Sequence, residues 1–110
     1  MLPALLDFYH KNIFSLEMIV KKTSHNIAKR FQIKDRGYIR EGYYADLTIL
    51  DINKSQIITR DNTLYKCGWS PFEGLTFNSS IHTTILNGRV VYSKGKINET
   101  PYGKKLVFER

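Results

Sequence analysis

The helical and the strand patterns of this sequence are segregated, and this order limits the folds that the chain can adopt. Apolar residues recur with a helical period up to Gln32, whereas from Asp35 onward short β-rich runs alternate with turn residues. Strands and helices do not alternate, so a parallel sheet with crossover helices is not expected. We therefore predict an α+β chain, with helices in residues 1–34 and strands in residues 35–110.

The predicted helices have an apolar face but no strands between them. Pro3 suits a first helical turn. Ser15 is a candidate N-cap with Glu17 in the following turn, and Asn26 is a candidate cap for a third, short helix. Because this face has no strands of its own, we expect it to lie exposed in the isolated chain and to need a partner surface. Its residues are Leu5, Leu6, Tyr9, Ile19 and Val20.

The clearest strand signal is a hairpin at residues 81–92. Asn87 and Gly88 separate two β-rich runs, and an Asn-Gly pair favours a two-residue turn with positive φ at both positions. Further strands are predicted at residues 45–51, 56–59 and 105–108.

The composition argues against several classes of function. The net charge of +7 favours anionic partners, but the basic residues are dispersed, so we expect no specific nucleic-acid binding. No apolar run approaches the roughly 20 residues of a membrane span, and no membrane partner is expected. The only cysteine, Cys67, cannot form an internal disulfide. We expect a cytoplasmic protein in which this thiol is buried or half-buried and inert.

Patterns for metal binding or catalysis are missing from the sequence. His10, His25 and His82 belong to no HxH or HExxH pattern, and a zinc site needs three or four converging ligands. Asp46 and Asp51 flank a predicted strand, where side-chain acceptors commonly stabilise turns. We therefore predict no catalytic residue, no metal ligand and no cofactor in this chain.

A loop between the predicted strands carries glycine, proline and two large aromatic residues. Glycine and proline shape such a loop, and Trp69 and Phe72 are expected to anchor it by burial. We predict a structural role for this loop, which consists of Trp69, Ser70, Pro71, Phe72, Glu73 and Gly74.

Three stretches, in this order, resemble the C-terminal end of the amidohydrolase superfamily. They are residues 24–33, residues 35–51 with the pattern G-x-I-x-x-G-x-x-A-D-L-x-x-x-D, and the Ser-Pro-Phe-Glu-Gly loop followed by the hairpin. The loop narrows the likeness to the dihydroorotase, allantoinase and hydantoinase group, and the Lys-Cys-Gly before it is most similar to dihydroorotase. The likeness covers nearly the whole chain, although Ile27 stands where the family often has proline.

The resemblance implies a parent enzyme with a (β/α)8 barrel and a binuclear zinc site, which hydrolyses dihydroorotate to carbamoyl aspartate in pyrimidine biosynthesis. Its zinc ligands are an HxH pair, a carboxylated lysine, two further histidines and an aspartate, and no residue of this chain matches those motifs. Residues 1–34 then correspond to the last barrel helices and residues 35–110 to part of an antiparallel β-sandwich. The loop at residues 69–74 is expected at the contact between sandwich and barrel.

The isolated chain is accordingly expected to be inactive, to bind the missing barrel portion and to self-associate through its open sheet edge. Two other functions stay open at this point. One is an autonomous, non-catalytic interaction module, and the weaker one is a basic nucleic-acid-binding domain. An upstream HxH motif would favour the enzyme, and a natural start at Met1 would favour the module.

Overall fold

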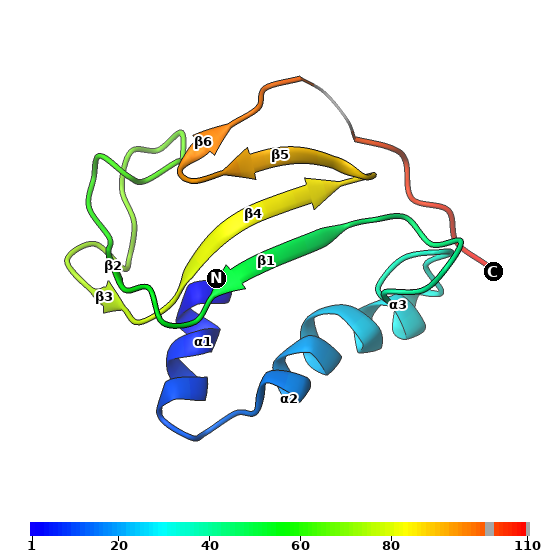
Figure 1. Ribbon diagram of the computed structural model, residues 1–110, viewed down its shortest axis with the longest axis horizontal. Coiled ribbons are helices and arrows are strands. Elements are labelled where there is room, and N and C mark those ends of the chain that lie inside the picture. The colour runs from blue at the N-terminus through cyan, green and yellow to red at the C-terminus, as the bar shows by residue number, and fades with distance from the viewer. Residues whose placement is uncertain (101–102, 110) are drawn as a thin grey trace.

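The computed structural model describes residues 1–100 and 103–109, and it places two helical segments beside an antiparallel sheet (Figure 1). The helical elements are α1 (Leu2–His10), α2 (Leu16–Val20), the π-helical turn η1 (Lys21–His25) and α3 (Asn26–Phe31). The strands are β1 (Leu47–Asp51), β2 (Gln56–Ile57), β3 (Thr76–Phe77), β4 (Ser80–Leu86), β5 (Arg89–Ser93) and β6 (Lys96–Ile97). The predicted order of helices before strands is therefore confirmed.

The second helical segment is continuous from α2 to α3. Ser15 caps its start as predicted, because its Oγ accepts a hydrogen bond of 3.1 Å from the backbone N–H of Met18. The prediction that Asn26 caps a third helix is wrong. Both His25 and Asn26 have right-handed helical backbone angles, so the π turn carries the helix through this position without interruption.

The main sheet has the strand order β1-β4-β5-β6, and all of its strand pairs are antiparallel. Asn87 and Gly88 connect β4 to β5 with φ of 50° and 80°, the left-handed geometry of the predicted hairpin turn. Lys94 and Gly95 form a second turn of this kind before β6, which the sequence patterns did not reveal. Strands β2 and β3 form a separate two-stranded ribbon.

Within the described part of the C-terminal segment, residues 103–109 do not join the main sheet. A strand was predicted at residues 105–108, but the structure has a single antiparallel bridge between Ile33 and Phe108 and a hydrogen bond of 2.8 Å from Lys34 N to Val107 O. The segment therefore runs back past the end of α3, as the trace near the C-terminus shows (Figure 1).

The helices pack beside β1, and the expectation that their apolar face lies exposed holds only for Val20, because Leu6 and Ile19 are buried and Leu5 and Tyr9 are partly buried. Leu6 is fully buried and Ile19 is 6% exposed, whereas Val20 is 46% exposed. A hollow of about 690 Å³ remains between the helices and β1. Its apolar lining is Leu2, Leu6, Leu16, Ile19, Val20, Ile39, Leu47, Leu50 and Ile52. Side chains therefore fill the core between the helices and the sheet only in part.

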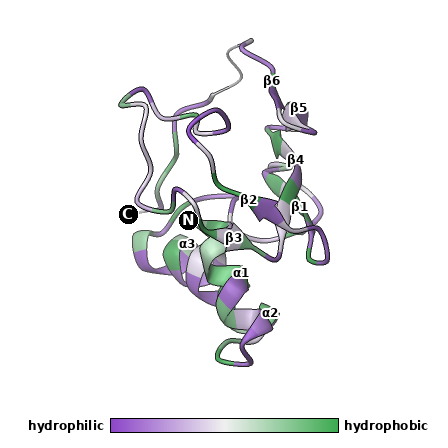
Figure 2. Ribbon diagram, turned by 90° about the vertical axis from the view of Figure 1, so that its left-hand side faces the viewer, coloured by the Kyte–Doolittle hydropathy of each residue, from purple (hydrophilic) through white to green (hydrophobic). Residues whose placement is uncertain are grey.

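One face of the main sheet carries several apolar side chains beside the buried Thr83, which pairs with Ile49. Directly paired residues on neighbouring strands share a face, and the pairing of Leu47 with Ile85 and of Ile85 with Val90 puts these three side chains together with Ile49. Ile49 and Val90 are each about half exposed. The helices lie next to β1 and do not extend over the outer strands (Figure 2), so this face has no complete cover among the described residues.

Candidate functional site

The loop at residues 69–74 is held by backbone hydrogen bonds and by one buried hydroxyl. Ser70 is 7% exposed, and its Oγ accepts a hydrogen bond of 3.2 Å from Phe72 N. Gly74, with φ of 83°, donates its N–H to Ile58 O at 2.8 Å, which ties the end of the loop to the chain that follows β2. The loop is therefore a defined structure, and Ser70 supports its backbone.

The aromatic residues of the loop have different environments. The ring of Phe72 packs edge-on against that of the buried Phe77, with 5.4 Å between the ring centroids. Trp69 is 59% exposed, so the expectation that it anchors the loop by burial is wrong for this chain. Cys67 is also exposed, contrary to the buried thiol that was predicted. The side chains of Cys67 and Trp69 are therefore exposed to solvent, although the loop itself is ordered.

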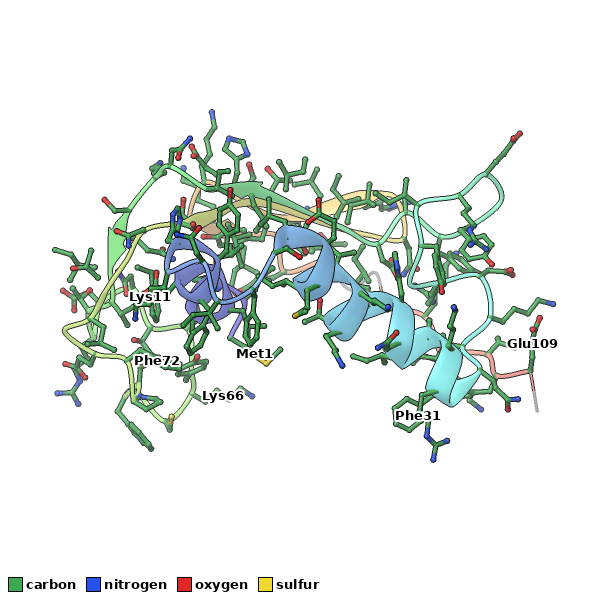
Figure 3. All side chains as sticks on the ribbon, turned by 90° about the horizontal axis from the view of Figure 1, so that it is seen from below. Met1, Lys11, Phe31, Lys66, Phe72 and Glu109 are labelled. Carbon is green, nitrogen blue, oxygen red and sulfur yellow. The ribbon has the colours of Figure 1, made fainter. Side chains whose placement is uncertain are left out.

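The loop lies beside the start of α1. Met1 and Pro3 line a hollow of about 160 Å³ together with Ser70 and Phe72. Figure 3 shows Met1 and Phe72 in the same part of the molecule, at the opposite end from Phe31. Further along α1, the side chain of Asp7 accepts a hydrogen bond of 3.2 Å from Asn78 N. The loop and the first helix thus form one surface at this end.

A buried arginine organises the opposite end of the sheet. Arg36 is 8% exposed, forms an ion pair with Asp46 and donates to Asn87 Oδ1 at 2.9 Å. Its guanidinium also lies 4.1 Å from the ring centroid of Tyr44. Asp46 Oδ1 accepts from Asn87 N at 2.8 Å, and Gly88 N donates to Ala45 O at 3.0 Å. The hairpin turn is therefore fixed to the segment before β1.

The loop at residues 69–74 and the contacts around Arg36 are not brought together, because the loop and the hairpin turn lie at opposite ends of the sheet (Figure 1). The structural role predicted for Asp46 agrees with its contacts, and Asp51 likewise accepts from Asn53 N at 3.1 Å. The sequence patterns did not identify Arg36 as a buried residue. Its position just before the G-x-I-x-x-G pattern was the only local signal.

The three histidines have separate contacts on separate elements. His10 Nε2 lies 2.8 Å from Ser79 Oγ, the His25 ring stacks on Tyr38, and His82 lies within hydrogen-bond distance of the next residue on β4. Within residues 1–100 and 103–109, no three His, Cys, Asp or Glu side chains are arranged to hold a metal ion. None of the helices in this part of the chain combines the length and hydrophobicity of a membrane span.

Comparisons with known proteins agree with this architecture. The family model described as "Amidohydrolase family" matches residues 2–91. A dihydroorotase of Pyrococcus furiosus is 36% identical over 105 residues, which are 96% of this chain and 25% of that protein. An allantoinase of Desulfitobacterium hafniense is 37% identical over 98 residues, or 89% of this chain and 22% of that protein.

A solved structure supports the same likeness. The L-hydantoinase (dihydropyrimidinase) of Arthrobacter aurescens superposes with a TM-score of 0.78 at 31% identity, covering 88% of this chain and 22% of that one. The chain therefore spans about a quarter of the length of the proteins that it matches.

Proposed function

Since this chain belongs to the amidohydrolase family, we propose that it forms the C-terminal part of a zinc-dependent cyclic amide hydrolase that acts on dihydroorotate in pyrimidine biosynthesis. The observation that carries this proposal is coverage: 96% of the chain aligns with only 25% of a dihydroorotase. The Lys-Cys-Gly-Trp-Ser-Pro-Phe-Glu-Gly segment favours dihydroorotate over other cyclic amides. A cytoplasmic location is part of the proposal and rests on the low cysteine content.

In this proposal the segment supports the barrel and has no role in the chemical step. The zinc that the family implies does not fit the described residues, because His10, His25 and His82 lie on different elements and have contacts of their own. We assign the loop at residues 69–74 to the contact with the barrel. In this contact the barrel would cover the exposed side chain of Trp69 in the loop and that of Tyr65 shortly before it.

The missing barrel portion is the proposed partner of the apolar surfaces. The hollow between the helices and β1 and the half-exposed Ile49 and Val90 leave apolar area in contact with water. Burying such a side chain contributes roughly 1.5–3 kcal/mol. In the isolated chain the same area would drive self-association.

A second candidate function, an autonomous interaction module, is favoured by one observation. Leu6 and Ile19 are buried within the described chain itself, so its helices and sheet already form a partial core. A module of this kind would be monomeric and would need no upstream portion.

We predict that the purified chain binds no stoichiometric zinc and does not hydrolyse dihydroorotate, because its described residues offer no ligand cluster. The natural protein that contains the chain should bind zinc and hydrolyse dihydroorotate faster than allantoin or hydantoin. Metal analysis by mass spectrometry and product assays on both proteins check this. One or more tightly bound zinc ions per isolated chain would contradict the structural role, and faster hydrolysis of allantoin would contradict the proposed substrate.

A further inference from the structure

A shallow hollow of about 570 Å³ lies along the second helical segment, and Leu16, Val20, His25 and Tyr38 line both this hollow and the one between the helices and β1. It is formed entirely by residues 16–40 and is called the basic hollow here. Its lining consists of Leu16, Glu17, Val20, Lys21, His25, Asn26, Lys29, Tyr38 and Arg40. We propose that the basic hollow binds a small polyanion that carries phosphate groups. This inference goes beyond the proposed function and does not depend on it.

Arg40 is held in place at the rim of the hollow. Its guanidinium lies 4.2 Å from the ring centroid of Tyr38 and 5.8 Å from that of Tyr43. Residues 40–43 form a turn, closed by a hydrogen bond of 3.1 Å from Tyr43 N to Arg40 O, with Gly42 at φ of 81°. This turn places the ring of Tyr43 near the guanidinium of Arg40. A planar guanidinium that is already oriented loses little freedom when it binds phosphate through two hydrogen bonds.

The charge of the hollow is unbalanced. The lining includes three cations, Lys21, Lys29 and Arg40, and a single carboxylate, that of Glu17, which leaves an excess of two positive charges. None of the three cations forms an ion pair with a described residue. The ion pair found among the described residues joins Arg36 and Asp46. Three unpaired cations around one concave surface raise the local concentration of anions.

The π turn lies at the hollow. Its two end residues, Lys21 and His25, both belong to the lining. Such turns are rare within helices and occur frequently at functional sites.

The aromatic stack favours a compact anion over single-stranded nucleic acid. His25 stacks on Tyr38 with 4.2 Å between centroids and 11° between planes, and Arg40 lies 4.2 Å from the same ring. An imidazole and a guanidinium cannot both lie at that distance over one face, so they occupy opposite faces of Tyr38. No face of this ring is then free to stack on a base. Proteins that bind single-stranded nucleic acid rely on such stacking.

The test uses the natural protein that contains this chain, with inorganic pyrophosphate as the probe. Calorimetric titration should show saturable binding, and hydrogen-exchange mass spectrometry should show protection confined to peptides from residues 16–43. Arg40→Gln and Lys29→Gln should each weaken binding about tenfold, the order expected for losing one charged hydrogen bond. Lys66→Gln removes the same charge from an exposed residue outside the hollow and should leave the affinity unchanged.

Three outcomes would overturn the proposal. Absence of saturable binding would do so directly. An equal loss in Lys66→Gln and Lys29→Gln would show an effect of diffuse charge alone. Binding of a single-stranded oligonucleotide that the Arg40 and Lys29 variants weaken, without binding of pyrophosphate, would assign the surface to nucleic acid. If Arg40→Gln disturbs folding, Lys29→Gln still decides, because Lys29 is exposed on the helix.

Discussion

A Gly37→Ala variant should lose about 2–5 kcal/mol of its free energy of unfolding, because two costs add at this position. Gly37 has φ of 83°, a conformation that disfavours any residue with a Cβ. The added Cβ would also lie 2.5 Å from Ala28 Cβ and 3.2 Å from Ser24 O. Since small domains have only about 5–15 kcal/mol in total, a large part of the population should unfold.

Urea titration followed by circular dichroism measures this loss, and the chain provides a matched control. Gly42 has φ of 81°, but a Cβ there would meet nothing within 4 Å, so Gly42→Ala should show the conformational cost alone. Adding Ala28→Gly to Gly37→Ala should recover part of the loss by removing the methyl group that clashes. Equal destabilisation of the Gly37 and Gly42 variants would mean that α3 does not pack against Gly37 as described.

An Arg36→Met variant should lose about 2–3 kcal/mol, somewhat less than the loss for a fully buried ion pair, because the Asp46 side chain is 29% exposed. Methionine keeps much of the side-chain volume but removes the ion pair and the hydrogen bond to Asn87 Oδ1. The Asp46 carboxylate would then face Asn87 N without its cation. The hairpin turn should therefore loosen along with the loss in global stability.

The same urea titration tests the Arg36 variant, with hydrogen exchange at residues 85–90 as a local measure. Arg60→Met is the control, because Arg60 is exposed and its replacement changes the net charge of the protein by the same amount. In the double variant Arg36→Met with Asp46→Leu the losses should be less than additive, because the unpaired carboxylate is gone. Strict additivity would contradict the coupling between these two residues.

The features that sequence patterns predicted correctly are local ones. The Asn87–Gly88 turn depends on the φ angles that these residues tolerate, and the Ser15 cap depends on one hydroxyl and the N–H three residues later. The order of helices and strands follows from periodicity. The resemblance to the amidohydrolases came from three short segments in a fixed order, which is information about the family and not about local physics.

The features that were missed depend on contacts between distant residues. Asn26 has a capping side chain, but the helix continues because η1 joins α2 to α3. Residues 105–108 have strand composition, yet their bridge partner is Ile33, more than 70 positions away. The burial of Arg36 depends on Asp46 and Asn87 meeting at one turn. Trp69 was expected inside the chain, but its burial depends on side chains from other segments, and the described residues leave it 59% exposed.

The central claim is that this chain is the terminal quarter of a cyclic amide hydrolase. The most direct test is the intact mass of the natural protein, captured from source cells with an antibody raised against this chain. Because the chain spans 25% of the Pyrococcus furiosus dihydroorotase, the account predicts a single polypeptide about four times its own 12.8 kDa. A natural product of 12.8 kDa would contradict the account and favour the autonomous module.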